Sequence, residues 1–319
     1  MNGTPRFRYW VPIVRLNPKK TFFPRIFIKI KTILILAINR ILCSLKIRGG
    51  KVVGFSKEGN VYLKFSVDTP IGMKNEKILL PRDYVIFQSI RTRGSWEKEL
   101  CSFLAQIFNT RLATNQTATH LLDIGAHSGM IAIQTSRLSK NPFIAFCVEP
   151  LPINLEALHE NMARQSILTE YKIFPYALGN RNQKVPIYTE KSNYGNTSLY
   201  ELIGKNTFTT QIDLRSTAEF VENEIPRSAS LVLKLDTQGS EIEILSNFPD
   251  SLWSQIMGGV IEVRGSSNLN HDKILLLLQK FCVFDKLFFE GNEKKIELSE
   301  LERFWLNNSG EERNLYFSR

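Results

Sequence analysis

The stretch from Leu121 to Gly129 reads Leu-Leu-Asp-Ile-Gly-Ala-His-Ser-Gly, a short apolar run that ends in a turn framed by two glycines. Gly125 and Gly129 permit positive φ angles and close approach of a ligand, because neither carries a Cβ. Ala126 keeps the turn thin. A second apolar run ends 20 residues later at Glu149-Pro150, where an acidic side chain can accept both hydroxyls of a ribose. This pairing predicts a nucleoside pocket.

The spacing of the glycines indicates which nucleoside binds. A nicotinamide or flavin fingerprint has the pattern Gly-x-Gly-x-x-Gly, whose second glycine makes room for a pyrophosphate. Here the pattern is Gly-x-x-x-Gly, with Asp123 two residues before Gly125. S-adenosylmethionine suits such a loop, since it carries an adenine, a ribose and an amino-acid end but no phosphate. The turn alone is weak evidence, because an ordinary strand-turn-helix of any α/β domain can look the same.

Apolar runs with strand character alternate with helical stretches between residues 116 and 290. The expected strands are His120–Asp123, Phe143–Val148, Tyr171–Phe174, Ser230–Leu235, Val260–Val263 and Phe284–Phe288. Helical spacing or capping marks Pro152–Met162, Ser216–Glu219, Gly239–Asn247 and His271–Phe281. This alternation predicts an α/β fold with a mostly parallel, Rossmann-like sheet and helices on both faces. Ligands then bind at the carboxyl ends of the strands, where the chain places Asp123, Glu149, Ala177, Asp236 and Glu262.

Six groups of residues match a known family in the same order and with compatible spacing. They are Ile78–Phe87 with Gly94–Glu97, Leu122–Gly129, Val148–Leu155 with Leu158 and Asn161, Tyr176–Gly179, Leu233–Glu241, and Val260–Val263. On these residues, which span roughly 78 to 265, the chain resembles the FkbM family of S-adenosylmethionine-dependent methyltransferases. The resemblance implies a class I methyltransferase fold and O-methylation of a sugar, a glycolipid or a natural product.

The resemblance also implies a cofactor site for S-adenosyl-L-methionine. The residues expected to bind this cofactor are Asp123, Gly125, Ala126, His127, Gly129, Glu149, Pro150, Ala177 and Leu178. Among them, Asp123 and the two glycines shape the methionine end, Glu149 holds the ribose, and the Ala177-Leu178 pair lies near the adenine.

Two positions differ from patterns common in the family. His127 stands where Asn is frequent, and Thr237-Gln238 where Val-Glu is also common. The second difference removes a carboxylate beside the expected reaction site, so no role of such a glutamate carries over. His127 is a candidate base if it faces the pocket, although a His in a turn more often satisfies backbone groups.

Methyl transfer from a sulfonium is an in-line displacement, which requires an aligned acceptor and, for a hydroxyl, removal of its proton. The catalytic residues expected are Asp236, His127 and Glu262. Asp236 follows the strand Ser230–Leu235, and the resemblance places it near the methyl-transfer centre; the alternative is that it caps the helix Gly239–Asn247. Glu262 ends the neighbouring strand and is expected to bind the acceptor, unless it pairs with Lys234 or Arg264.

Four further residues are expected to bind the substrate: Trp96, Glu97, Asn196 and Ser198. Trp96 and Glu97 can stack on and hydrogen-bond a sugar, or form a buried Trp with an N-capping Glu. The segment Asn193–Ser198 is rich in small polar residues and resembles the acceptor-side loop of the family, with a simple hairpin turn as the alternative.

Cysteine and histidine usage favours neither disulfides nor a metal cluster. The four cysteines lack Cys-x-x-Cys spacing, and the four histidines lie far apart in the sequence. A metal held by Asp236 with Glu262 is conceivable chemically, but no residue pattern specifies one, and no metal is expected. A reducing compartment is the simpler interpretation.

The positive charge of the chain is concentrated in its first residues. Residues 1–51 carry twelve of the 41 Lys and Arg side chains and no acid, which leaves 29 basic against 31 acidic side chains in the remainder. The rest of the chain is therefore near neutral, which argues against nucleic-acid binding by that part.

Residues 24–46 within this basic arm have apolar residues at helical spacing, beginning with Pro24 in a first turn. The longest uncharged stretch, Thr32–Asn39, is far shorter than the ~18 residues of a membrane span. We therefore expect an amphipathic helix on an anionic membrane surface, with a helix packed on the protein core or a snorkelling span as alternatives. No cleavable signal is evident.

The sequence thus predicts four segments. They are a basic amphipathic arm (1–50), a small cap segment over one mouth of the pocket (51–115), a Rossmann-like methyltransferase domain (116–290) and a C-terminal extension (291–319). The expected function is methyl transfer near a membrane surface by a cytoplasmic, peripheral enzyme. The alternatives are a nicotinamide-dependent oxidoreductase, which lacks its third glycine here, and a non-catalytic membrane adaptor on a methyltransferase-like fold.

Overall fold

The computed structural model describes twelve stretches of the chain: residues 51–55, 61–67, 74–81, 83–111, 119–164, 170–190, 193–201, 204–205, 207–265, 270–292, 294–307 and 310–319. The arm predicted for residues 1–50 lies outside the described residues. Among the helices that are described, none combines the length and the apolar character needed to cross a membrane.

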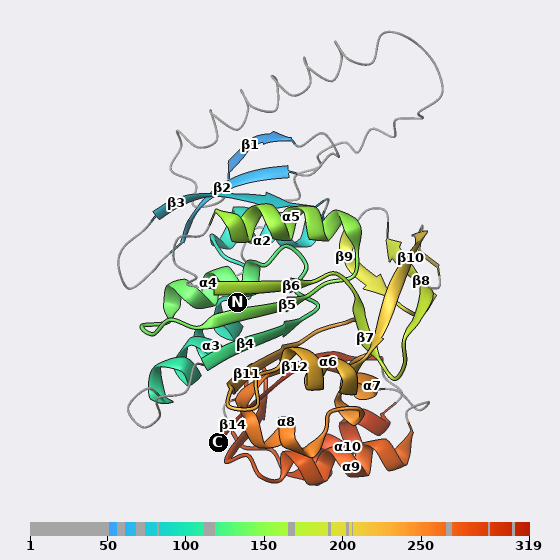
Figure 1. The fold of residues 1–319 in the computed structure, drawn as a ribbon. Coiled ribbons are helices and arrows are strands. Elements are labelled where there is room, and N and C mark those ends of the chain that lie inside the picture. Colours follow the sequence, from blue (N-terminus) through green and yellow to red (C-terminus); the bar gives the residue numbers. More distant parts are fainter. Residues whose placement is uncertain are drawn as a thin grey trace, which may run out of the picture.

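A seven-stranded sheet forms the centre of the protein, in the order β13-β14-β12-β11-β4-β5-β6 (Figure 1). Its strands are β4 (Thr119–Ile124), β5 (Ile144–Val148), β6 (Glu170–Phe174), β11 (Ser230–Leu235), β12 (Ile256–Arg264), β13 (Lys286–Phe289) and β14 (Glu312–Ser318). The five strands from β6 to β12 run parallel, which confirms the predicted fold class. The chain winds outward in both directions from the β4/β11 pair, so a ligand crevice is expected at the carboxyl ends of these two strands.

The last strand of the chain was not foreseen. We expected residues 291–319 to form an extension, but β14 lies antiparallel between β12 and β13 inside the central sheet. Its buried side chains, from Leu315 to Ser318, make it part of the core. The C-terminal segment therefore completes the sheet of the preceding domain.

Helices cover both faces of this sheet, which explains the nearly continuous apolar runs of its parallel strands. On one face lie α3 (Lys98–Arg111), α4 (Met130–Leu138) and α5 (Pro152–Ala163). On the other lie α6 (Thr217–Glu224), α7 (Glu241–Ser246), α8 (Asp250–Gln255), α9 (His271–Phe281) and α10 (Leu298–Leu306). Neighbouring residues of β4 show the alternation, since Leu121 packs on the first face and Leu122 on the second.

The predicted capping box at the start of α6 is half formed. The Oγ atom of Ser216 accepts a hydrogen bond from the backbone N–H of Glu219. The Glu219 carboxylate does not return to Ser216 but accepts from Nδ2 of Asn182, whose Oδ1 in turn accepts from the Ser216 N–H. Asn182 therefore links Glu219 to the N–H of Ser216, in place of the direct hydrogen bond of a capping box.

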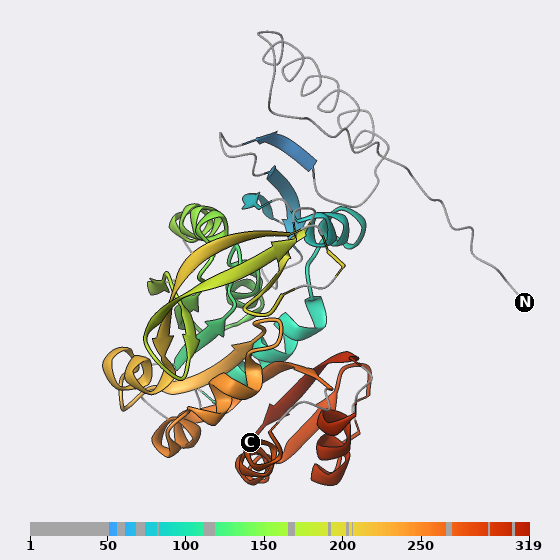
Figure 2. The same cartoon turned by 90° about the vertical axis from the view of Figure 1, so that its right-hand side faces the viewer.

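A smaller four-stranded sheet stands beside the carboxyl ends of the parallel strands, in the order β7-β10-β8-β9 (Figures 1 and 2). Its strands are β7 (Ala177–Gly179), β8 (Gln183–Glu190), β9 (Asn193–Ser198) and β10 (Thr207–Ser216). The segment after β6 therefore leaves the central sheet and forms one wall of the crevice before the chain returns through α6 to β11.

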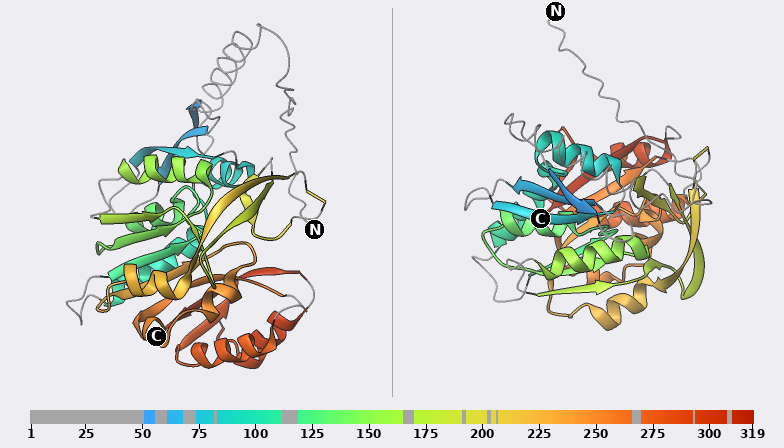
Figure 3. Two further views of the ribbon diagram at one scale, coloured as in Figure 1. Left: turned by 45° about the vertical axis from the view of Figure 1, so that its right-hand side comes forward. Right: turned by 90° about the horizontal axis from the view of Figure 1, so that it is seen from above.

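The predicted boundary of the cap at residue 115 is wrong, because α3 packs on the central sheet. The cap itself contains three antiparallel strands and one helix, and β3 lies against α5 (Figure 3). They are β1 (Lys51–Phe55), β2 (Val61–Val67), β3 (Lys74–Leu80) and α2 (Tyr84–Arg93). Asp83 caps α2, because its Oδ1 accepts from the N–H groups of Val85 and Ile86.

One buried side chain joins this cap to the rest of the protein. Asn161 of α5 accepts from the backbone N–H of Leu79 through Oδ1, at 2.6 Å. Its Nδ2 donates to the carbonyls of Leu79 at 2.7 Å and of Ser128 at 2.8 Å. A single amide thus fixes the end of β3, the glycine turn and α5 to one another.

We predict that Asn161→Ala lowers the free energy of unfolding by about 2–4 kcal/mol, because it leaves buried backbone groups of Leu79 and Ser128 without partners. Chemical denaturation measures the change. Asn180→Ala at an exposed position serves as the control, with an expected change below about 0.5 kcal/mol. A loss no larger in Asn161→Ala than in the control contradicts the role given to Asn161.

Candidate active site

A cavity of about 470 Å³ opens at the carboxyl ends of β4, β5, β11 and β12, between the cap and the small sheet. Of the sequence-predicted residues, those that line this cavity are Trp96, Glu97, Gly125, Ala126, His127, Glu149, Pro150, Ala177, Leu178, Asn196, Asp236 and Glu262. Asp123, Gly129 and Ser198 do not line it. The structure thus brings most of the predicted site together around one space, from segments far apart in the sequence.

The glycine turn is held to the neighbouring strand by its backbone. The N–H groups of Gly125 and Ala126 both donate to the carbonyl of Val148, at 2.9 and 3.0 Å. The next N–H, that of His127, donates to Oε2 of Glu149 at 2.9 Å. The turn after β4 and the acid after β5 therefore form one rigid unit.

The two glycines make room mainly for protein rather than for a ligand. A Cβ on Gly125, whose φ is +81°, would lie 1.8 Å from the carbonyl oxygen of Asp236. A Cβ on Gly129, whose φ is +79°, would lie 2.8 Å from Cδ1 of Leu158. Gly125 thus lets the ends of β4 and β11 approach each other, and Gly129 lets α5 pack against the turn.

Asp123 lies beneath the turn and is fully buried. Its Oδ1 lies 3.4 Å from Nζ of Lys234, and the same Nζ donates to the carbonyl of Gly125 at 2.7 Å. Burial raises the pKa of Asp123, while the Lys234 ammonium opposes this shift. Asp123 therefore acts on the site through Lys234, which lines the cavity and which the sequence suggested only as a partner of Glu262.

Glu149 is buried and accepts three hydrogen bonds. His127 N–H donates to its Oε2, whereas the N–H of Leu151 and Nδ2 of Asn154 donate to its Oε1 at 2.8 and 3.2 Å. Burial raises the pKa of Glu149 to about 7, although these three donors act in the opposite direction. A carboxylate offers about four acceptor sites, so acceptor capacity remains for a ligand hydroxyl.

Asp236 stands at the end of β11, beside Lys234 and Gln238. Its Oδ1 accepts from Nε2 of Gln238 at 3.0 Å, and its Oδ2 lies 3.8 Å from Nζ of Lys234. The alternative role as a helix cap is wrong, because the backbone N–H groups of Thr237 and Gly239 donate to Glu241 instead. Asp236 is therefore left facing the cavity.

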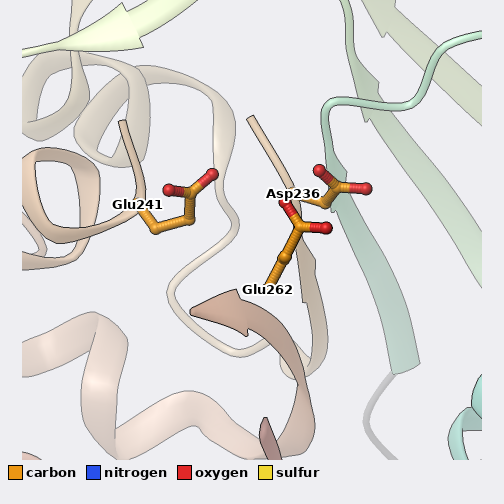
Figure 4. A group of neighbouring side chains, drawn as sticks. All are labelled: Asp236, Glu241 and Glu262. Atoms are coloured by element: carbon orange, nitrogen blue, oxygen red, sulfur yellow. The ribbon is translucent and has the colours of Figure 1, made fainter. Parts of the chain in front are cut away.

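Glu262 lies two residues before the end of β12, and Figure 4 shows its carboxyl group beside that of Asp236. Its Oε2 accepts from Nε2 of Gln238 at 2.7 Å. Burial raises the pKa of Glu262 to about 9, and the charge of Asp236 acts in the same direction. The ion pairs considered for Glu262 are taken by other acids among the described residues: Lys234 pairs with Asp123 and Asp236, and Arg264 with Glu312.

His127 faces the cavity from a left-handed backbone conformation, with φ at +51°. Its Nδ1 lies 3.2 Å from Oγ of Ser128, and its Nε2 lies 3.8 Å from Oδ2 of Asp83. Burial lowers the pKa of His127, while the Asp83 carboxylate opposes the shift. Among the described residues Nε2 has no hydrogen-bond partner, so a neutral imidazole presents this nitrogen beside Asp83.

Trp96 and Glu97 reach the cavity from the connection between α2 and α3. The backbone of Trp96 is held by Gln134, whose Oε1 accepts from its N–H and whose Nε2 donates to its carbonyl at 2.7 Å. Glu97 has a φ of +44°, and its carbonyl accepts from Cys101 in the first turn of α3. Burial raises the pKa of Glu97 to about 7, with a further contribution from Asp236.

The segment Asn193–Ser198 is a hairpin strand at the edge of the cavity, and its role as an acceptor-side loop stays a prediction. It forms β9, a hairpin strand against β8, and it lines the cavity through residues that include Asn196. Nδ2 of Asn196 donates to Oε2 of Glu190 at 2.8 Å. Ser198 is buried behind the cavity, where its Oγ donates to the carbonyl of Gln238 at 2.8 Å.

Asp83 and Gln238 are the two cavity residues that sequence reasoning missed most clearly. Beyond capping α2, Asp83 accepts from the N–H of Gly195 through Oδ2 at 3.1 Å and so ties the cap to β9. An Asp before an apolar run signals a helix cap, but nothing local signals a partner 112 residues away. Gln238 was noted only as a departure from a family pattern.

The protein has a Rossmann-like fold of the class I methyltransferase type. The evidence is the strand order of the central sheet, the antiparallel strand β14, and the cavity at the β4/β11 pair, where the winding of the sheet reverses. The model of the FkbM methyltransferase domain matches residues 123–285, just over half of the chain. The chain therefore belongs to the FkbM methyltransferase family.

Solved structures of methyltransferases resemble the protein only distantly. An FkbM methyltransferase from Methylobacillus flagellatus KT is 14% identical, with a TM-score of 0.36, and the match covers 67% of this chain and 47% of that chain. An S-adenosylmethionine-dependent O-methyltransferase from Thermotoga maritima is 12% identical, with a TM-score of 0.35, over 80% of this chain and 77% of that chain. No curated protein matches the sequence.

The raised pKa of Glu262 predicts a pH dependence of stability. The folded protein keeps this proton up to about pH 9, whereas the unfolded chain releases it near 4.5. The folded state therefore binds more protons between these values, and this group's contribution to the free energy of unfolding falls as pH rises.

Between pH 6 and pH 9 the unfolding temperature of the wild type should fall more than that of Glu262→Gln. The difference between the two decreases should be on the order of a few degrees. Thermal unfolding followed by circular dichroism over this range measures the difference. Glu222→Gln, at an exposed position on α6, should keep the wild-type slope. Identical slopes in all three proteins would show that Glu262 titrates normally.

Proposed function

We propose that the protein is an S-adenosylmethionine-dependent methyltransferase that methylates a hydroxyl of a sugar, a glycolipid or a natural product. One observation carries the proposal: the glycine turn and Glu149 line the same cavity of about 470 Å³ as Asp236 and Glu262. That volume lies within the range of small-molecule sites.

The residues on one side of the cavity fit the cofactor. Glu149 keeps acceptor capacity for ribose hydroxyls after its three internal hydrogen bonds. The turn from Gly125 to His127 would hold the methionine end, and Ala177 with Leu178 would lie against the adenine. When bound, the cofactor supplies an electrophilic methyl group on a sulfonium.

The residues on the other side suit a hydroxylated acceptor. At neutral pH the protonated Glu262 can donate a hydrogen bond, since its pKa is raised to about 9, whereas the Asp236 carboxylate accepts one. Asp236 would orient the acceptor hydroxyl and take its proton, and His127, which lines the same cavity, is a second candidate base. Trp96, Glu97 and Asn196 would contact the remainder of the acceptor, with Ser198 supporting this wall from behind.

We further propose that the enzyme acts in the cytoplasm at an anionic membrane surface, without a nucleic-acid partner. The support for the membrane surface is the sequence of residues 1–51, which carry twelve basic side chains and no acid. The support against nucleic acid is the remainder of the chain, which carries 29 basic and 31 acidic side chains. Each Lys or Arg near an anionic leaflet contributes on the order of 1 kcal/mol, so such a segment would concentrate the enzyme beside a lipid-linked acceptor.

Calorimetric titration with S-adenosylmethionine tests the cofactor site. We expect micromolar-range binding that Glu149→Gln weakens about 10–100-fold, because hydrogen bonds to a carboxylate are replaced by bonds to a neutral amide. Ribose hydroxyls favour the charged carboxyl, so wild-type affinity should rise with pH up to about 7 and then level off, and Glu149→Gln should show no such rise.

Glu222→Gln is the matched control and should bind as the wild type does. NADH should not bind, since the turn lacks the third glycine. Undiminished binding of S-adenosylmethionine to Glu149→Gln would contradict the role of Glu149 in binding the ribose. Tight binding of NADH, without binding of S-adenosylmethionine, would favour an oxidoreductase.

Liposome flotation tests the membrane proposal. The full chain should float with vesicles that contain anionic lipid and lose this binding as salt is raised, because the attraction is electrostatic. The chain without residues 1–51 should stay at the bottom of the gradient. Flotation of that shorter chain would contradict the role given to the basic arm.

A further inference from the structure

We propose that the carboxamide of Gln238 holds Asp236 and Glu262 together as the pair that meets the acceptor, and does so in place of a cation. Three acids crowd this side of the cavity: carboxylate oxygens of Asp236, Glu241 and Glu262 all lie within 4.8 Å of one another (Figure 4). The arrangement of their hydrogen bonds assigns Gln238 this positioning role. The contact of this pair with an acceptor rests on the function proposed above. The hydrogen bonds of Gln238 to the two acids do not depend on that function.

Glu241 is already committed to the loop that precedes its helix. Its Oε1 accepts from the N–H of Thr237 at 2.7 Å and from Oγ1 of Thr237 at 2.9 Å, and its Oε2 accepts from the N–H of Gly239 at 3.0 Å. Three neutral donors thus hydrogen-bond this buried carboxyl group. Of the two remaining acids, Asp236 lies 3.8 Å from Nζ of Lys234, and a partner that Asp236 and Glu262 share must come from elsewhere.

Gln238 provides that partner with a single atom. Its Nε2 donates to Oδ1 of Asp236 at 3.0 Å and to Oε2 of Glu262 at 2.7 Å. An amide nitrogen has two hydrogens, so each acid receives one. The opposite amide orientation would place the amide oxygen against Oδ1 of Asp236, so the contact with Asp236 favours the orientation as described.

The backbone of Gln238 is held for this purpose from two sides. Its φ of +56° is in the left-handed region, which a residue with a side chain adopts only where the surroundings impose it. Ser198 of β9 donates to its carbonyl, and Glu241 accepts from the N–H of the next residue, Gly239. The amide is thus placed by the small sheet and by the α7 loop together.

A neutral amide at this position has a chemical consequence. It joins the two acids without adding charge, while both acids still line the cavity. A carboxylate at position 238 would instead create a group of facing acids of the kind that binds Mn²⁺ or Mg²⁺. Gln238 thus decides between an amide-bridged pair and a cation-bridged one.

Manganese binding to the full-length protein tests the proposal, with electron paramagnetic resonance of free Mn²⁺ as the readout. Wild type should bind Mn²⁺ weakly, and Gln238→Glu should bind it at least about tenfold more tightly. The double substitution Gln238→Glu with Glu262→Gln should lose this gain. Gln211→Glu, which adds the same charge at an exposed position on β10, should bind as the wild type does.

Two results overturn the proposal. One is tight Mn²⁺ binding by wild type that Glu262→Gln abolishes, because a cation would then bridge the acids despite Gln238. The other is a Gln238→Glu protein that unfolds at the wild-type temperature yet shows no gain in affinity. Mn²⁺ binding does not require the cofactor, so it tests the role of Gln238 alone. Titration of the same proteins with S-adenosylmethionine tests the proposed function separately.

Discussion

The site depends on one buried cation. Nζ of Lys234 lies 3.4 Å from Asp123 and 3.8 Å from Asp236, and it donates to the carbonyl of Gly125 at 2.7 Å. Burial alone would lower the pKa of Lys234, but the two carboxylates raise it above its usual value, so the side chain stays charged. Removing a partner from such a group leaves an uncompensated charge in the interior, which proteins tolerate poorly. Lys234 thereby joins the glycine turn to the acid at the end of the next strand.

This linkage follows from the topology of the sheet. Lys234 and Asp123 are register partners in the β4/β11 pair, where the winding of the sheet reverses and the crevice opens. The half of the cavity with Glu149 comes from β4 and β5, and the half with Asp236 and Glu262 comes from β11 and β12. A shift in the pairing of these two strands would therefore displace both halves at once.

The pattern of the sequence was sufficient to predict most of the fold, because buried parallel strands and amphipathic helices leave local signals. The strand Ser230–Leu235 and the helix His271–Phe281 have the bounds expected from periodicity. The position of β14 could not be predicted, since a strand of seven residues does not indicate which neighbours it pairs with. Likewise, the ends of strands identified Glu149, Asp236 and Glu262, but not the partners that hold them.

Those partners come from loops with unusual backbone conformations. Gln238 and His127 both have positive φ, which is uncommon for residues other than Gly and which the sequence pattern did not indicate. Asp83 contacts Gly195 only because the cap and the small sheet meet above the crevice. The helix-capping role considered as an alternative for Asp236 is wrong for a similar reason, because Glu241 accepts the hydrogen bonds of the same loop.

The most direct test of the account is a crystal structure of the protein with S-adenosylhomocysteine. The account predicts that the ribose hydroxyls donate to Glu149, that the homocysteine end lies against the turn from Gly125 to His127, and that the sulfur faces Asp236 across the cavity. A ligand bound elsewhere, or one whose sulfur points away from Asp236 and Glu262, would contradict it.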